Sequence, residues 1–321
     1  MLRDLAVSAF HRAGGLAAAR WLNRKGVRIL MYHQFNTPAA ALATQLAHIR
    51  QRYAPVSLAQ VADWLTSGAP IPNNACAVTV DDGYRDFFDV AYPLFRDYRI
   101  PATVYLVSDF LDGKLWLWTD RVRYAFLRTP LEAASLELPG GAALHFELDT
   151  PARRVTGSVR MAEALKRLPN TDRLAFLDCL PRSLKVSLPE APPAEYAPLR
   201  WDQVRAAAGP LIEFGAHTAT HPILSSVSSE RELTAEIEGS KRRIEEELDR
   251  PVEHFCYPNG SDRDIGAAAI EAVRAAGFRT GVTTETGLVS TADDRLRLRR
   301  IGVEPGLQEL YFQRCAAGFR V

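Results

Sequence analysis

The chain has 321 residues, 47% of them hydrophobic and 24% charged, with a formal net charge of +1. This composition is typical of a globular protein with one large core, or with a core and a subdomain. The near-zero charge gives no support to a nucleic-acid partner, and no apolar run is long enough to cross a bilayer.

The four cysteines lie far apart and form no C-x-x-C pair; they are Cys76, Cys179, Cys256 and Cys315. This spacing excludes a zinc ribbon and does not indicate a disulfide framework. Because scattered, reduced thiols are typical of the cytoplasm, we expect a cytoplasmic protein, either free or peripheral at the inner membrane.

Residues 1–26 are expected to form a basic amphipathic helix, interrupted at Gly14 and Gly15. They carry five basic side chains against one acid, and their longest apolar stretch is shorter than the core of a signal peptide. The helix either packs on the main domain with a solvated basic face, which we favour, or rests on a membrane surface.

From residue 27 onward, short apolar runs alternate with helical patterns. Buried strands are expected at residues 27–32, 76–80 and 102–107. Helices are expected at residues 39–53, 57–67 and 84–99. Strand–helix alternation favours a parallel sheet or barrel. The alternation breaks near residue 111, and we interpret 111–198 as a mixed insertion, with a strand at 143–148 and a basic helix near 160–168.

The alternation resumes at Trp201. Strands are expected at 211–215, 254–257, 278–283 and 296–303, and helices at 201–208, 230–248 and 264–276. The helix at 230–248 begins with a capping box from Ser229 to Glu232. The expected fold is therefore α/β, with residues 27–321 forming one domain that includes the insertion.

Polar side chains follow the expected strands at the points where these end. They are His33, the pair Asp81-Asp82, His217 with His221, and Asn259. In α/β barrels these strand ends line the active site. An H-x-x-x-H spacing and an Asp-Asp-Gly turn are each common by chance. Their joint placement at strand ends favours a functional site.

Asp82, His217 and His221 suit a borderline metal such as zinc. Two imidazoles and one carboxylate leave a coordination position open for water, which is typical of a catalytic site. Asp81 cannot easily bind the same ion, because adjacent side chains diverge. It is free to act as a general base.

Three motifs resemble those of the polysaccharide deacetylases, the NodB-homology proteins of carbohydrate esterase family four. Residues 79–83, Thr-Val-Asp-Asp-Gly, resemble the family's T-F-D-D-G. Residues 215–221 contain His-Thr-Ala-Thr-His, which resembles H-[ST]-x-x-H. Residues 255–260, Phe-Cys-Tyr-Pro-Asn-Gly, resemble F-R-x-P-Y-G. The resemblance covers most of residues 27–304, outside the insertion.

The resemblance implies a distorted (β/α) barrel of about seven strands, with the insertion after the third strand. It implies metal-dependent hydrolysis of N-acetyl groups on amino sugars of a poly- or oligosaccharide, such as an exopolysaccharide. Asp81 would be the base, and Asp82, His217 and His221 would hold the metal. The backbone N–H of Asn259 would bind the oxyanion. Ligand type favours Zn²⁺, with Co²⁺ or Ni²⁺ as alternatives.

The chain departs from the family at two positions. The third-motif arginine, which orients the base, falls at Cys256; Arg300 is the candidate replacement, with a surface arginine as the alternative. The family's late L-x-H histidine is absent from residues 296–321. His33 is the candidate general acid, because poly-N-acetylglucosamine deacetylases carry a similar early Y-H; the alternative is a core histidine that caps its strand.

Weaker substrate-binding candidates lie in or next to the insertion; they are Trp116, Trp118, Asp120 and Trp201. Tryptophan faces stack on sugar rings, although most tryptophans are simply part of a core. Two other functions stay open. One is an N-deformylase or deacylase of a lipid-linked sugar, and the other is a sugar-binding relative without catalysis.

Overall fold

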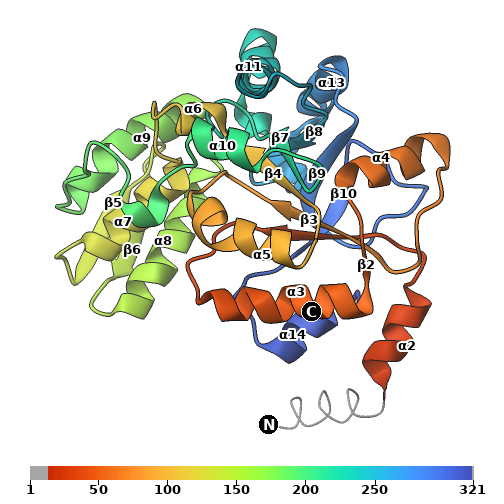
Figure 1. Ribbon diagram of the computed structural model, residues 1–321. Helices are drawn as coiled ribbons and strands as arrows, with labels where there is room; N and C mark the ends of the chain where they lie inside the picture. Colours follow the sequence, from red (N-terminus) through yellow and green to blue (C-terminus); the bar gives the residue numbers. More distant parts are fainter. Residues whose placement is uncertain (1–13, 320–321) are drawn as a thin grey trace.

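The structure, a computed structural model, describes residues 14–319, and its centre is a closed barrel of seven parallel strands (Figure 1). The strands in spatial order are β1 (Arg28–Tyr32), β10 (Leu298–Gly302), β9 (Thr280–Thr286), β8 (His254–Cys256), β7 (Ile212–Ala216), β4 (Ala102–Leu106) and β3 (Ala75–Val80). Pairing of β1 with β3 closes the barrel, and β2 (Ala54–Pro55) adds a short strand beside the start of β3. The predicted distorted (β/α) barrel of about seven strands is confirmed.

The strands form where short apolar runs can be buried on both sides. Every residue of β3 and of β4 is buried. This is expected of parallel strands that are covered by helices on the outside and by side chains within the barrel. The alternation of such runs with helices favoured a parallel sheet or barrel, and the pairing of β1 with β3 shows that the sheet closes into the barrel that the resemblance implied.

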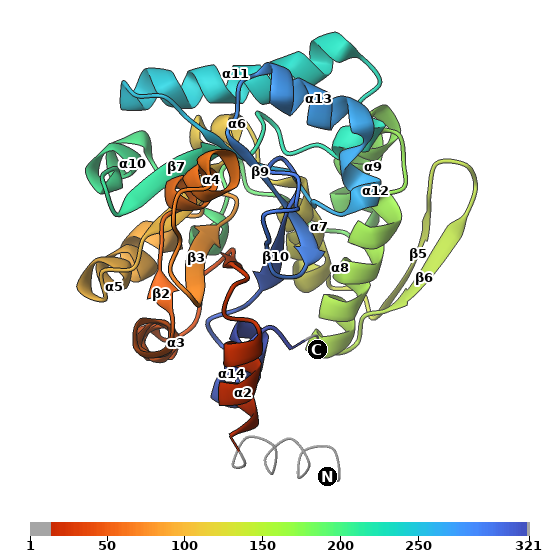
Figure 2. The same ribbon diagram turned by 90° about the vertical axis from the view of Figure 1, so that its right-hand side faces the viewer.

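Helices surround the barrel (Figures 1 and 2). They are α3 (Ala39–Arg52), α4 (Leu58–Ser67), α5 (Tyr92–Asp97), α6 (Ser108–Leu111), α10 (Trp201–Ala207), α11 (Glu230–Leu248), α12 (Asp262–Ile265), α13 (Ala267–Ala275) and α14 (Glu309–Ala316). Two expected helices are irregular. The one at 84–99 contains a π-helical segment, Phe87–Ala91, and the one at 264–276 is divided at Gly266, whose φ is 75°.

The segment between β4 and β7 contains its own apolar cluster. Its main elements are α7 (Trp118–Arg128), β5 (Ala133–Glu137), β6 (Ala143–Glu147), α8 (Pro151–Leu165) and α9 (Asn170–Ser183). Buried side chains from the β5–β6 hairpin and from the helices before and after it pack in this cluster, among them Phe126, Phe146 and Leu177. The apolar residues that are scattered along the sequence of this segment thus meet in space, beside the barrel (Figure 1).

Only part of the expected N-terminal helix lies within the described residues. Helix α2 (Gly15–Leu22) buries Leu16 and Ala19 against Ala317, whereas Trp21 and Leu22 are exposed. Residues 1–13 lie outside the described part, so membrane contact and cellular location stay predictions. Within residues 14–319, no helix is both long enough and apolar enough to span a membrane.

Candidate active site

The polar residues at the ends of the strands lie on one edge of the barrel. Asp81 follows β3, and its backbone N–H donates to the carbonyl of Tyr32, the last residue of β1, at 2.9 Å. His217 follows β7, and its N–H donates to the carbonyl of Leu106 in β4 at 2.9 Å. The ladder therefore continues past the strand ends and holds these residues in register with one another.

Asp82, His217 and His221 converge as a possible metal site. The Oδ1 atom of Asp82 lies 3.3 Å from Nε2 of His217 and 3.5 Å from Nε2 of His221. All three side chains are buried, and their ligand atoms lie within 4.8 Å of one another. Burial alone would raise the pKa of Asp82, but the hydrogen bond with His217 keeps that pKa below its usual value. The donor set fits a divalent ion with room for further ligands.

The two imidazoles are suited to metal binding. Nδ1 of His217 lies 2.7 Å from the carbonyl oxygen of Cys256. Donation from Nδ1–H to that carbonyl fixes the orientation of the ring, so that Nε2 faces Asp82 and would bind the metal in place of a proton. Burial lowers the pKa of His221 to about 3, so this ring is neutral at physiological pH. A neutral imidazole is the form that binds a metal.

The backbone around the histidines adopts an unusual conformation. Asp82, Thr218 and His221 have φ values of 75°, 67° and 60°, a region that non-glycine residues seldom occupy. Thr218 Oγ1 accepts the N–H of His221 at 3.0 Å. Glu236 of α11 accepts the N–H groups of the two residues before His221 at 2.9 and 2.8 Å. Sequence reasoning missed Glu236, because nothing local links it to a loop 16 residues away.

Asp81 forms a buried ion pair with Arg300 of β10. Two nitrogens of the Arg300 guanidinium each donate to one oxygen of the Asp81 carboxylate, both at 2.7 Å. Arg300 also donates to the carbonyl of Thr283 and to Thr79 Oγ1, and it is fully buried. Burial alone would raise the pKa of Asp81, but the guanidinium lowers it below its usual range. Asp81 is therefore ionised at neutral pH and fixed in orientation.

A second group of possible ligands consists of Asp81, His217 and Cys256. We favour the group that contains Asp82 for two reasons. Both Asp81 oxygens already accept hydrogen bonds from Arg300. Burial raises the pKa of the Cys256 thiol, so the thiolate that a metal would need is disfavoured.

The candidates for proton donation and oxyanion binding lie at different places. His33 follows β1, and its Nε2 is 3.7 Å from Oδ2 of Asp81, with 47% of its side chain exposed. Asn259 has a φ of 59°, and its carbonyl accepts a hydrogen bond from Thr284 Oγ1 at 2.8 Å. Asn259 lines a different cavity from the one that Asp82 and His33 line. Its role as an oxyanion donor stays a prediction.

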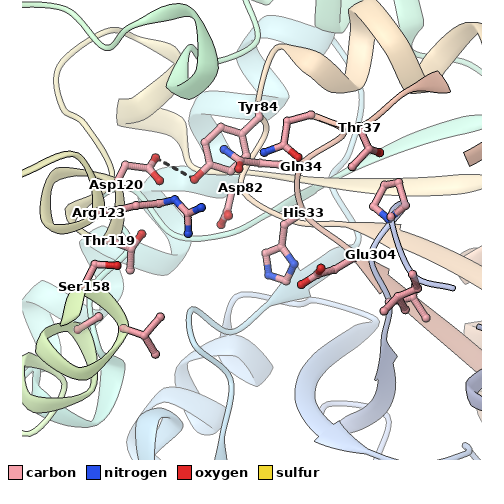
Figure 3. A pocket seen from close by; sticks show the side chains of 17 residues that line it. His33, Gln34, Thr37, Asp82, Tyr84, Thr119, Asp120, Arg123, Ser158 and Glu304 are labelled. Carbon is pink, nitrogen blue, oxygen red and sulfur yellow. Dashed lines mark hydrogen bonds between the residues drawn. The ribbon is translucent and has the colours of Figure 1, made fainter. Parts of the chain in front are cut away.

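A cavity of about 540 Å³ opens beside Asp82 and His33 (Figure 3). The barrel loops form one wall, which includes Tyr84 and Glu304, and helices α7 and α8 form the other. Sequence reasoning selected Asp120 but missed Tyr84, which directly follows Asp-Asp-Gly and donates to Oδ2 of Asp120 at 2.8 Å.

None of the three tryptophan candidates lines this cavity. Trp118 is buried in the apolar cluster of the segment between β4 and β7. Trp116 stacks against Tyr196 and lines a separate cavity, and Trp201 donates to Asp112 at 2.8 Å. Sugar stacking on these rings beside Asp82 is not supported by their positions, because each ring packs against the protein elsewhere.

Comparison with known proteins confirms the resemblance to polysaccharide deacetylases. The model of the Polysaccharide deacetylase family matches residues 184–281, which include the second and third motifs. The poly-beta-1,6-N-acetyl-D-glucosamine N-deacetylase of Escherichia coli K12 is 35% identical over 74 residues. That match covers 23% of this chain and 11% of the relative, so the chain matches about a tenth of that protein's length.

Solved structures agree with the fold. A Streptococcus pyogenes deacetylase, PplD, solved in complex with acetate, aligns with a TM-score of 0.57 and 19% identity over 88% of this chain and 93% of its own. IcaB from Ammonifex degensii aligns with a TM-score of 0.60 and 16% identity over 91% of this chain and 96% of its own. At these identities the likeness concerns the fold alone, and it extends over nearly the whole length of both structures.

Proposed function

We propose that this chain, related to the polysaccharide deacetylases by family-model match, is a metal-dependent hydrolase that removes N-acetyl groups from amino sugars of a poly- or oligosaccharide. One observation carries the proposal: the Asp82 carboxylate and two imidazoles converge, and a second carboxylate, that of Asp81, lies beside them. The adjoining cavity is within the size range of small-ligand sites. The E. coli relative's printed activity, N-deacetylation of poly-β-1,6-N-acetyl-D-glucosamine, agrees with this substrate class.

The residues have distinct roles in the proposed reaction. Asp82, His217 and His221 would hold the metal, and ligand type favours Zn²⁺ over Co²⁺ or Ni²⁺. When bound, such an ion acidifies water and polarises a carbonyl.

Asp81 accepts a proton from the attacking water as the water oxygen bonds to the acetyl carbon. Arg300 holds both oxygens of the base in place. His33 then protonates the departing nitrogen as the C–N bond breaks, which leaves acetate and a free amino sugar. The half-exposed ring of His33 lies beside Asp81 and lines the cavity, as this step requires.

Replacement of the base tests the assignment. Asp81→Asn should keep its bound metal, because Asp82 and both histidines are unchanged, and should lose about 10²-fold or more of its turnover, the usual contribution of a general base. Elemental analysis and acetate release from an N-acetylglucosamine oligomer measure the two quantities. Asp178→Asn, at a surface carboxylate, is the matched control. Loss of metal, or wild-type turnover, would remove Asp81 from this role.

The same assay addresses the alternatives. Formate release in place of acetate release from the matching N-acyl sugars would identify an N-deformylase. Metal-dependent turnover of any N-acylated sugar would exclude a relative that only binds sugars.

A further inference from the structure

One wall of the cavity comes from outside the barrel. Helix α7 supplies Thr119, Asp120 and Arg123, and α8 supplies Ser158, opposite the barrel residues Asp82 and His33 (Figure 3). These helices belong to the segment between β4 and β7, which lies beside the barrel and lines the cavity together with the barrel residues. The wall is therefore suited to select the substrate, whereas the barrel residues would carry the reaction.

Arg123 differs from the other arginines of α7. Arg121 pairs with Asp178 at 3.0 Å, and Arg128 pairs with Glu195 at 3.4 Å. Arg123 forms no ion pair of this kind with any carboxylate in residues 14–319. Its side chain is exposed, and it points into the cavity (Figure 3). A guanidinium that faces a cavity without an acidic partner is available to a ligand.

The nearby carboxyl group of Asp120 does not neutralise this charge. Asp120 is buried and accepts the Tyr84 hydroxyl. Burial raises the pKa of Asp120 to about 8, although Tyr84 and Arg123 both oppose the rise. Asp120 is thus largely protonated at neutral pH. The positive charge of Arg123 stays uncompensated on this wall, and the acidic residue Glu304 lies on the opposite wall beside His33 (Figure 3).

We infer that the cavity takes an acidic glycan, in which Arg123 binds the carboxylate of a uronic acid residue next to the N-acetylated amino sugar. The inference rests on the proposed function. A guanidinium presents parallel N–H donors that match a carboxylate in a bidentate pair, whereas neutral hydroxyls gain less from the charge. Thr119 and Ser158 add hydroxyl groups on the same wall for the sugar ring.

A matched pair of substrates tests the inference. One is a tetrasaccharide of alternating N-acetylglucosamine and glucuronate, and the other is the same molecule with its carboxylates reduced to alcohols. Wild-type kcat/KM should be at least about tenfold higher for the acidic molecule. Arg123→Gln should remove this preference and change kcat/KM for the reduced molecule less than about threefold. Arg123→Lys should keep part of the preference, and Arg121→Gln, on the same helix, should keep all of it.

Calorimetric binding of the same two molecules separates failure of the inference from failure of the proposed function. If neither molecule releases acetate, the proposed function fails for them, and tighter binding of the acidic molecule that depends on Arg123 would still support the acidic site. Equal binding and equal turnover of both molecules by the wild type would overturn the inference. Equal loss for both molecules in Arg123→Gln would also overturn it, because it would indicate only a structural role.

Discussion

At the scale of single residues, the pair formed by Asp81 and Arg300 determines the state of the proposed base. Both side chains are buried, and the two residues are 219 positions apart in the chain. Arg300 binds both oxygens of the Asp81 carboxylate, as we expect of a replacement for the third-motif arginine. Cys256 lies at that motif position, with its Sγ 3.5 Å from Oδ2 of Asp81. The charge that orients the carboxylate therefore comes from β10.

Removal of Arg300 should destabilise the protein and inactivate it. Arg300→Met leaves the Asp81 charge buried without a partner, which costs about 3–5 kcal/mol. Because the folded-state pKa of Asp81 is lowered, the stability that the pair contributes is fully present above the unfolded-state pKa of about 4. It is lost progressively as the pH falls from there through the lower folded-state pKa. Denaturant unfolding at neutral and acidic pH measures the loss of stability and its dependence on pH, and acetate release measures the loss of turnover.

A double variant provides the control for this prediction. Asp81→Asn combined with Arg300→Met removes both charges and should recover part of the stability but none of the turnover. If Arg300→Met alone kept wild-type stability and activity, the ion pair would have no role in either.

At the scale of elements, the approach of three strands positions the first histidine. Gly215 in β7 lies opposite Tyr105 of β4, two residues before His217. A Cβ atom at Gly215 would lie 2.5 Å from the Tyr105 ring and 2.7 Å from the carbonyl oxygen of His254 in β8. Only glycine allows this approach, so the small residue of the second motif has a packing role.

Gly215→Ala should therefore separate β7 from its neighbours. We expect a loss of stability on the order of 3 kcal/mol, the upper part of the range for overpacking, together with weaker metal binding through a displaced His217. Gly239→Ala in α11 is the control, because its Cβ meets no atom within 4 Å and alanine favours a helix. Thermal unfolding compares the two, and equal melting temperatures would contradict the packing argument.

At the scale of the whole molecule, the proposed metal site joins the ends of β3 and β7, which lie on either side of β4 in the barrel. Asp82 follows β3 near residue 80, and the histidines follow β7 near residue 216. A ligand that binds only the folded chain stabilises it by mass action. Metal binding should thus increase the free energy of unfolding even when no substrate is present.

Addition of Zn²⁺ to the chelator-treated protein should raise its melting temperature. At a free metal concentration about 1,000 times the Kd, the gain is about 4 kcal/mol. Asp82→Asn should abolish the rise, and Cys179→Ser, at an exposed thiol, should keep it. A rise that is lost in Cys256→Ala but kept in Asp82→Asn would move the site to Asp81, His217 and Cys256.

Several elements were not predicted; they are β2, α6, α7, β5, α9, α14 and the π-helical segment at 87–91. The helix expected near 160–168 is α8, which begins earlier and spans Pro151–Leu165. Helix α9 contains Pro181, and β5 has only one buried residue, so neither has a strong apolar period. The strongly periodic helix α11, in contrast, was predicted at its observed bounds.

The sequence by itself determined the strands of the barrel, most helices between them and the motifs at the strand ends, because burial and secondary structure depend on patterns within a few residues of each other. The barrel was implied by the resemblance that these motifs carry. The tertiary structure decided between the two alternatives for Arg300 by placing it on Asp81. It alone brought Glu236 to the loop between the histidines and Arg123 to the cavity. These contacts depend on how the barrel closes and how the helices between β4 and β7 pack beside it. The residues next to each of these positions in the sequence do not indicate that arrangement, because each contact joins residues that are distant in sequence.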